Sequence, residues 1–458
     1  MSLVSINPST GKTIQKYKEL SQNSIGKILE KVSLAQETWS NTNLEFRLDV
    51  LNEMTGVLND GKREFSKLMA QEMGKPVIQG EIEIDKCIWL CEYYFKQAPK
   101  ILKQKEINLR PLKSYISFQP IGIILGIMPW NFPFWQVFRF AIPTLIGGNG
   151  AVLKHASNVQ GCAMGIESCF INSGFPKHIF TNMPIVGRRT ELLIKDSRIS
   201  AVTLTGSTPV GKSVASIAGK YLKKTVLELG GNDPYIILDD ANIDKAVNGC
   251  IDGRILNAGQ SCISAKRIIV TEAVYNTFVK KIKMRLSEKI MGDPIDKVDI
   301  GPMVSIEARN EVHNQVCMSI NLGAVLDLGG VIPNLSGAYY PITLLTNVEP
   351  GMPAFDEEIF GPVFSLIKAT DEKHAIELAN STSFGLGSAI FTRDIKKGEN
   401  LAKNKIHSGV CFVNDFVKSD PRLPFGGIKD SGYGRELSSY GMLEFLNIKT
   451  IVVNDESN

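Results

Sequence analysis

The stretch IGIILGIMPWNFPFWQVFRFAIPTLIGGNGAVL, residues 121–153, is long and apolar enough to suggest a membrane segment, so its interpretation separates a membrane protein from a globular one. Three prolines interrupt it, and Asn131, Gln136 and Arg139 would need polar partners inside lipid. The stretch is better explained as a buried strand, a turn, a short buried helix and a second strand. We therefore expect it to form protein core and not a membrane span.

The segments around this stretch show the same alternation of strands and helices. Short apolar runs at 201–207 and 224–231 have the texture of strands, and helical patterns lie at 160–175 and 187–196. A second alternating block runs from 233 to 415, whereas the first hundred residues are mainly amphipathic helices. This order predicts an α/β fold with a doubly wound, mostly parallel sheet and ligands beyond the carboxyl ends of its strands.

Composition limits the class of protein. A chain of 458 residues is too long for one simple core, and a net charge of +4 argues against a dedicated nucleic-acid binder. The first residues lack the basic and apolar regions of a secretory signal. The eight cysteines are scattered without paired C-x-x-C spacing. We therefore expect reduced thiols, a cytoplasmic location and no metal site.

Three short motifs carry possible chemistry, and each alone leaves a plainer explanation open. NAGQSCISAKR, residues 257–267, places Cys262 in a small, polar stretch without a nearby histidine, but a lone cysteine is usually a small apolar residue. LTGSTPVGKS, residues 204–213, could hold a phosphate at a helix N-terminus, or Ser207 could simply cap that helix. Glu228 in LELGGNDP could be a general base or a salt-bridged glutamate at a turn.

The segment MPWNFPFWQVFRF, residues 128–140, is more specific. Pro133 suits the first position of a helix, and steps of four place Asn131, Trp135 and Arg139 along roughly one face. A buried guanidinium requires an anionic partner. For Arg139 that partner is either a structural carboxylate or a substrate.

Taken together, six motifs in order resemble the aldehyde dehydrogenase superfamily over nearly the whole chain: MPWNFP, LTGSTPVG, LELGG, GQSC, EEIFGPV and PFGGIKDSGYGRE. Within it, FWQVFRF, LKHASN and FVKSDPRLPFGG are most similar to bacterial succinate-semialdehyde dehydrogenases. The resemblance implies a Rossmann-type cofactor domain (1–101 and 121–230), an α/β catalytic domain (231–431) and a small β domain of oligomerisation strands (102–120 and 444–456). It also implies a homodimer or homotetramer, which suits a β-branched run at the C-terminus that must pair somewhere.

The resemblance also assigns the chemistry. Cys262 would attack the aldehyde, and the Asn131 side-chain amide with the Cys262 backbone N–H would hold the oxyanion. Glu228 would activate the water that hydrolyses the thioester. Members of the family that transfer the acyl group to coenzyme A lack this base, so we expect release of the free acid. A protein that has lost catalysis on this scaffold is disfavoured because Cys262, Glu228 and Asn131 are all present.

Cofactor contacts follow from the same resemblance. The residues expected at the dinucleotide are Trp130, Lys154, Ser157, Gly206, Ser207, Glu358 and Phe360. Ser157, in KHAS, stands where many relatives carry a glutamate that repels a 2′-phosphate, so NADP is expected to be preferred over NAD. The glycine-rich stretch expected further on reads MPIVGRRTE and retains only Gly187, which leaves the contacts there undefined.

The expected substrate is a short aldehyde that bears a carboxylate, with succinate semialdehyde favoured over glycolaldehyde or glutarate semialdehyde. The residues expected to bind it are Trp135, Arg139, Ser419 and Phe425. Lys418 and Arg422 either add positive potential at the cavity mouth or belong to a solvated loop. Ser264, two residues beyond Cys262, leaves no vicinal cysteine for a redox switch.

Overall fold

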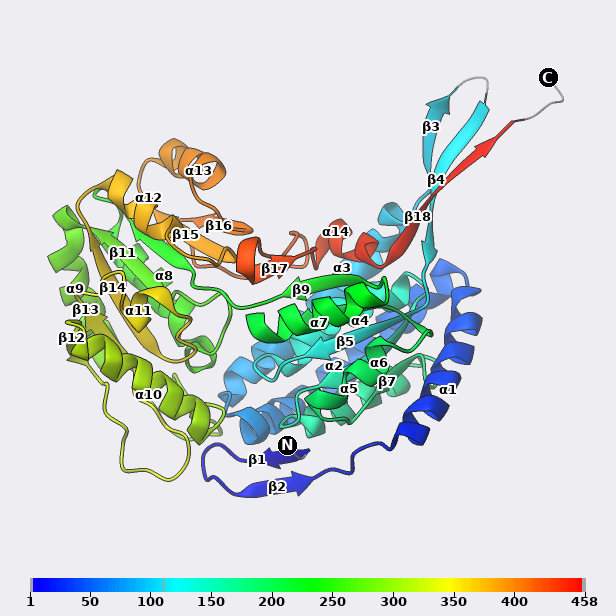
Figure 1. Cartoon of the computed structure of the whole chain (residues 1–458), viewed down its shortest axis with the longest axis horizontal. Helices are drawn as coiled ribbons and strands as arrows, with labels where there is room; N and C mark the ends of the chain where they lie inside the picture. The colour runs from blue at the N-terminus through cyan, green and yellow to red at the C-terminus, as the bar shows by residue number, and fades with distance from the viewer. Residues whose placement is uncertain (1–2, 110–111, 455–458) are drawn as a thin grey trace.

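The computed structural model describes residues 3–109 and 112–454. Residues 1–2, 110–111 and 455–456 of the expected domain ranges lie outside the described residues. Two large sheets form the body, and a small antiparallel sheet projects from it and carries the C-terminal end of the chain (Figure 1).

The first large sheet has six strands, parallel except for β17 at one edge. Their order is β17 (Gly432–Tyr433), β9 (Lys224–Glu228), β8 (Ile199–Thr205), β5 (Ile123–Met128), β6 (Gly150–His155) and β7 (Phe180–Asn182). One face is covered by α1 (Gln22–Ser40), α6 (Glu191–Ile194) and α7 (Thr208–Lys220). The other face is covered by α4 (Pro133–Ile146) and α5 (Gln160–Asn172), with α2 (Leu44–Met73) and α3 (Val77–Ile101) packed outside them. The sheet is therefore doubly wound, as predicted.

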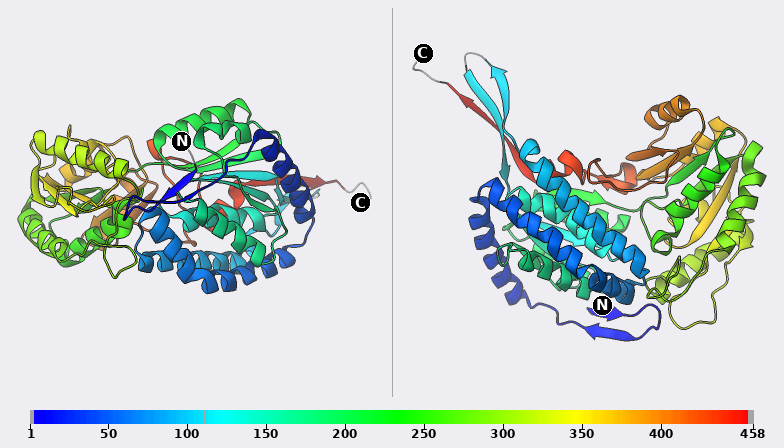
Figure 2. Two further views of the ribbon diagram at one scale, coloured as in Figure 1. Left: turned by 90° about the horizontal axis from the view of Figure 1, so that it is seen from below. Right: turned by 180° about the vertical axis from the view of Figure 1, so that it is seen from behind.

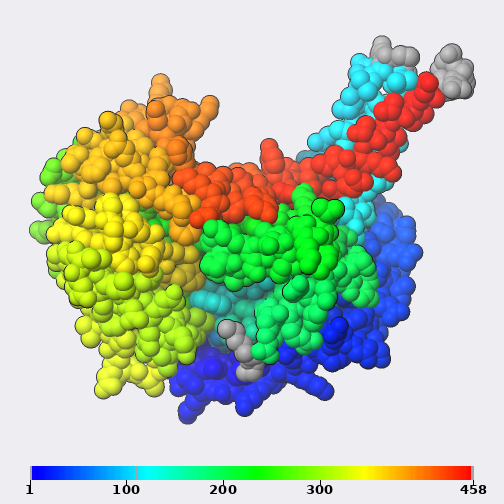
Figure 3. All heavy atoms as spheres, in the orientation of Figure 1, coloured from blue at the N-terminus to red at the C-terminus, as the bar shows by residue number. Residues whose placement is uncertain are grey.

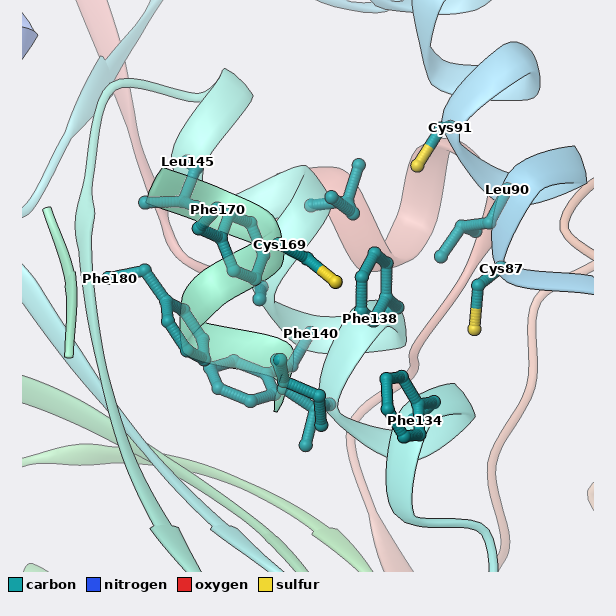
Figure 4. Packing of buried hydrophobic residues seen from close by; sticks show 14 of the residues in the cluster. Cys87, Leu90, Cys91, Phe134, Phe138, Phe140, Leu145, Cys169, Phe170 and Phe180 are labelled. Atoms are coloured by element: carbon teal, nitrogen blue, oxygen red, sulfur yellow. The ribbon is translucent and has the colours of Figure 1, made fainter. Parts of the chain in front are cut away.

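The apolar stretch at residues 121–153 is buried in this part of the structure. It forms β5, then α4 beginning at Pro133, then β6, and every residue of α4 is buried. Phe138 stacks on Phe170, and Phe170 stacks on Phe180, between α4, α5 and β7 (Figure 4). The stretch is apolar along its length because α4 is enclosed by the sheet and by the neighbouring helices. No helix within the described ranges is long and apolar enough to cross a membrane.

The second large sheet has seven strands, parallel except for β12 at its edge. Their order is β12 (Val325–Leu328), β13 (Thr343–Thr346), β14 (Val363–Ala369), β11 (Arg267–Thr271), β10 (Pro234–Ile237), β15 (Gly387–Phe391) and β16 (Val410–Val413). Helices α8 (Ile243–Ile255) and α9 (Glu272–Ser287) cover one face. The other face is covered by α10 (Ile306–Asn321), α11 (Pro353–Asp356), α12 (Glu372–Asn380) and α13 (Ile395–Asn404).

Two small sheets complete the chain. The N-terminal hairpin pairs β1 (Val4–Ile6) with β2 (Thr13–Lys16) along the underside of the body (Figure 2). The projecting sheet has the order β18 (Leu446–Val453), β4 (Leu112–Pro120) and β3 (Lys105–Leu109). β18 follows α14 (Ser438–Glu444) and pairs antiparallel with β4 along its whole length, so the terminal strand has the pairing that its sequence required.

Candidate active site

Cys262 lies where two cavities meet. The larger cavity has a volume of about 450 Å³ and is lined by residues that follow β5, β8 and β9 and by residues that precede β14. The smaller one, of about 130 Å³, lies between α3, α4 and the loop at 416–425. Cys262 and Gln136 line both cavities, so a molecule in either one approaches the same thiol.

Unusual backbone conformations set the position of the thiol. After α8, Asn257, Ala258 and Gly259 all have positive φ, between 53° and 73°, in the left-handed region that L side chains rarely adopt. A Cβ on Gly259 would lie 2.2 Å from the carbonyl oxygen of Gly361, so only glycine fits there. This close approach brings the cysteine loop against the segment that carries Glu358 and Phe360.

The Asn131 amide is fixed from both sides. Its Nδ2 donates to the carbonyl of Gln260 at 3.1 Å, and its Oδ1 accepts a hydrogen bond from Gln136 Nε2 at 3.0 Å. The Asn257 side chain donates to the backbone carbonyl of Asn131 at 2.9 Å. Because an amide nitrogen carries two N–H groups, the second one remains to donate within the larger cavity that Asn131 lines.

The thiol is not activated by its surroundings alone. Burial raises the pKa of Cys262 to about 12, although the positive charges of Lys266 and Arg139 oppose the rise. Lys266 Nζ donates to the Cys262 carbonyl at 2.5 Å and pairs with Glu358 Oε1 at 2.9 Å. The free thiol is therefore protonated at neutral pH, and attack on a carbonyl requires a base.

Glu228, the last residue of β9, has the character of such a base. Its side chain is buried, and neither carboxyl oxygen has a hydrogen-bond partner among the described residues. Burial raises the pKa of Glu228 well above its ordinary value, and the negative charge of Glu436 raises it further. The alternative of a salt-bridged glutamate at a turn does not hold in this structure. Glu228 itself lines neither cavity, but Leu229 and Gly230 line the larger one.

Arg139 has a carboxylate partner within the protein. Its Nη2 lies 2.7 Å from Glu436 Oε2, and both side chains are only 4 % exposed. The guanidinium also lies over the ring of Phe425, 5.0 Å from the centroid. Of the two partners that the sequence left open, the structure contains the structural carboxylate. Arg139 nevertheless lines the smaller cavity, and its Nε has no partner among the described residues.

The predicted substrate residues gather in the smaller cavity, which Trp135, Arg139, Ser419 and Phe425 all line. Trp135 Nε1 donates to Ser419 Oγ at 3.0 Å. Asn131 precedes α4 and lines the larger cavity, whereas Trp135 and Arg139, within α4, line the smaller one.

The predicted cofactor residues divide into two groups. Five line the larger cavity: Trp130, Gly206, Ser207, Glu358 and Phe360. The rings of Trp130 and Phe360 are 5.9 Å apart, edge to face, and Ser207 begins α7 without making a side-chain capping bond. Lys154 and Ser157 do not line this cavity; Lys154 lies near the carboxyl end of β6, next to β5, and Ser157 lies in the turn beyond it.

Several residues of the site carry no signal that the sequence argument used. Gln136 orients Asn131, Lys266 holds Glu358, and Lys86 and Glu83 from α3 line the smaller cavity. Glu436 lies within the motif PFGGIKDSGYGRE, which had pointed to the family without assigning it a role.

Comparison with known proteins places the chain in a family. The profile of the aldehyde dehydrogenase family matches residues 2–451. A protein of Synechocystis sp. named "Probable succinate-semialdehyde dehydrogenase (NADP(+))" is 43% identical over 98% of this chain and 99% of its own. An Escherichia coli succinate semialdehyde dehydrogenase, named with NAD(P)+, is 41% identical over 98% of this chain and 97% of its own.

A solved structure agrees with these sequence relatives. The succinic semialdehyde dehydrogenase of Streptococcus pyogenes, determined in complex with NADP+, superposes with a TM-score of 0.96 at 34% identity, over 99% of this chain and all of its own. The chain therefore belongs to the aldehyde dehydrogenase family, with the fold that its sequence predicted.

Proposed function

We propose that this protein oxidises succinate semialdehyde to succinate with reduction of NADP or NAD. One observation carries the proposal: a single thiol, Cys262, lines both the cavity that suits a dinucleotide and the cavity that suits a short aldehyde. The full-length relatives with that activity support the choice of substrate.

The larger cavity has the features that a nicotinamide dinucleotide needs. The N-terminus of α7, with Gly206 and Ser207, offers backbone N–H groups to a pyrophosphate. Glu358, held by Lys266, offers a carboxylate to ribose hydroxyls, and Trp130 and Phe360 give apolar walls. When bound there, the nicotinamide supplies a hydride acceptor. Ser157 and Lys154 near the end of β6 support a preference for NADP, as the names of the relatives do.

In the proposed reaction the Cys262 sulfur bonds to the aldehyde carbon, and the thiol proton passes to Glu228. The carbonyl oxygen becomes an oxyanion, which the Asn131 amide and the Cys262 backbone N–H stabilise; one such donor typically contributes about 3–4 kcal/mol. Loss of hydride from that carbon leaves a thioester. Glu228 releases the first proton to solvent and then takes a proton from the water that attacks the thioester. The carbon–sulfur bond breaks, and the leaving thiolate takes that proton from Glu228, so that the thiol is restored as the acid leaves.

Glu228 must turn toward the thiol to act in both steps, since it lines neither cavity in this structure. Its two unpartnered oxygens mean that this rotation breaks no side-chain hydrogen bond within the described part of the chain. We also propose that the protein works in the cytoplasm, because all eight cysteines are free thiols.

The test is a spectrophotometric assay of NADPH and NADH formation with succinate semialdehyde, glutarate semialdehyde, glycolaldehyde and butanal. We expect the highest kcat/KM for succinate semialdehyde with NADP. Cys262→Ala should abolish turnover, whereas Glu228→Gln should slow both the formation of NADPH and the release of the acid. A Cys262→Ala variant with parental activity would overturn the proposal, and NAD favoured tenfold or more would overturn its cofactor preference.

A further inference from the structure

Lys86, on the face of α3 that lines the smaller cavity, has a distinctive environment. Its Nζ lies 2.8 Å from Ser419 Oγ and 4.5 Å from the centroid of the Trp135 ring. It thus contacts two of the side chains expected to bind the substrate. Cys262 lines the same cavity, so this small space contains an ammonium group as well as the reactive thiol.

The other cations that line this cavity are already neutralised. Arg139 pairs with Glu436 at 2.7 Å, and Lys418 pairs with Asp415 at 2.7 Å. Within the described ranges, Lys86 has no carboxylate oxygen within 4 Å. It is therefore the cation of this cavity whose charge remains available.

The carboxylates near Lys86 are committed to other partners. Glu83 forms a buried ion pair with Lys75 and accepts hydrogen bonds from the backbone N–H groups of Phe134 and Trp135. Asp420 binds Arg422 through both oxygens. Asp252, which also lines the cavity, is exposed to solvent and forms no ion pair with Lys86.

A largely buried ammonium without a counter-ion is unfavourable, and burial together with the charge of Arg139 lowers the pKa of Lys86 to about 8. An anion bound beside Lys86 would remove this penalty. The Ser419 hydroxyl oxygen accepts hydrogen bonds from both Lys86 and Trp135, so these polar groups lie together. The cavity thus contains a thiol to meet the aldehyde end of a four-carbon substrate and an ammonium group to meet its carboxylate end.

We infer that Lys86 supplies the positive charge that binds the substrate carboxylate, and that Arg139 acts mainly through Glu436. This inference rests on the proposed function and assigns the residue that selects a carboxylate-bearing aldehyde. Ser419 then positions the lysine and shares the anion, and Trp135 forms the wall beneath it.

The experiment compares Lys86→Met, which keeps the length of the side chain and removes its charge, with Lys86→Arg, which keeps the charge. We expect Lys86→Met to raise KM for succinate semialdehyde by about tenfold or more while changing KM for butanal by less than about threefold. Lys86→Arg should retain most of the selectivity. Butanal turnover reports a folded catalytic site in each variant, and Lys86→Gln provides a second neutral variant should Lys86→Met fail to fold.

The matched control is Lys418→Met, a lysine of the same cavity that is paired with Asp415 and should affect the two aldehydes alike. Equal changes for both aldehydes in Lys86→Met would overturn the inference and leave the proposed function standing. A parent enzyme that oxidises butanal but not succinate semialdehyde would overturn the proposed function instead. Lys86 would then be tested by inhibition of butanal oxidation with succinate, which the inference predicts to weaken about tenfold in Lys86→Met.

Discussion

At the residue scale, the buried charges around Glu228 set its proton affinity. Arg139 pairs with Glu436 at 2.7 Å, and its charge also acts on the buried carboxyl of Glu228. The charge of Glu436 raises the pKa of Glu228, and the charge of Arg139 lowers it. An ionised carboxylate whose pKa is raised is a stronger general base than an ordinary glutamate, because it binds a proton more strongly.

Replacing Glu436 by Gln should lower the pKa of Glu228. Removal of the negative charge leaves Arg139 free to stabilise the Glu228 carboxylate, so the ionised base should persist to lower pH. We expect the acid limb of the pH profile of kcat to shift to lower pH. The thermal unfolding temperature, measured in parallel, reports the cost of unpairing Arg139. Glu444→Gln, which removes the carboxylate partner of Lys224, is the control. An acid limb that stays in place or moves to higher pH would contradict this prediction.

The Cys262 thiol should become reactive only as its proton is removed. Because its pKa is raised to about 12, the thiolate fraction of the free enzyme should increase about tenfold per pH unit between pH 6 and 9. The rate of alkylation of Cys262 by iodoacetamide, followed by mass spectrometry of its peptide, measures this fraction. Cys262→Ser identifies the background labelling of other cysteines. A rate that levels off below pH 8 would show a thiolate activated without cofactor or substrate.

The sequence motifs were sufficient to propose the reacting groups but not to predict the charged residues around them. Cys262, Glu228 and Asn131 stand in motifs that leave plainer explanations open one by one, and their proposed roles follow from the resemblance of six motifs in order. Arg139 was recognised as needing an anion, but Glu436 is supplied by a distant segment that the fold brings beside α4. Lys86 lies in an ordinary amphipathic helix, where a lysine on one turn predicts only a solvated face.

At the element scale, α4 is the structural centre of the site. It begins at Pro133, as the sequence predicted, and its first turn is held by Glu83 of α3. Glu83 Oε1 accepts hydrogen bonds from the N–H groups of Phe134 and Trp135, each at 2.9 Å, and its other oxygen pairs with Lys75. A carboxylate at a helix N-terminus satisfies donors that the helix itself leaves free. The position of Trp135 in the smaller cavity thus depends on a residue in another helix.

Replacing Glu83 by Gln should destabilise the protein strongly. Lys75 is fully buried, and loss of its partner leaves an uncompensated charge, which typically costs about 3–5 kcal/mol. Urea unfolding followed by circular dichroism measures the change. Asp85→Asn, in the same helix, removes the exposed partner of Lys62 and should cost less than about 1 kcal/mol. Similar losses for the two variants would contradict a structural role of the Lys75–Glu83 pair.

The elements themselves were predictable where one residue pattern dominated. Strands β5, β6, β8 and β9 and helices α1 and α2 correspond to apolar runs and helical periods that the sequence displayed. The order of strands in the second sheet was not predictable, because β14 lies beside β11 and β10 lies beside β15, and these partners are distant in sequence. The short β17 gave no pattern of its own; it forms because Gly432 pairs with Glu228.

At the scale of the whole molecule, the site forms between the two large sheets. The first sheet contributes the carboxyl ends of β5 and β8, and the second contributes the segments that precede β11 and β14. Asn131 and Glu228 lie at the ends of strands of the first sheet, whereas Cys262 precedes β11 of the second, and both cavities are lined by Cys262.

The sheet of β18, β4 and β3 projects from the body of the chain (Figure 3). In the register of β18, β4 and β3, the residues Ile448, Val452, Phe118, Ile116 and Ile107 share one face. Ile448, Val452 and Ile107 are 56%, 50% and 44% exposed in the single chain. The opposite face carries polar residues such as Lys449, Ser117 and Gln119. An apolar sheet face of this kind is typical of a surface that a second subunit covers.

We therefore predict that the protein forms a homo-oligomer and that this face holds its subunits together. Replacing Ile448 and Val452 together by Glu should place charges within the buried contact and convert the protein to a smaller species, because desolvation of a carboxylate there is strongly unfavourable. Light scattering coupled to size-exclusion chromatography measures the mass of each variant. Lys449→Glu, on the polar face of the same strand, is the matched control and should leave the mass unchanged. If the double variant keeps the parental mass, the subunits make contact through another surface. A monomeric parent would show that this face forms no subunit contact.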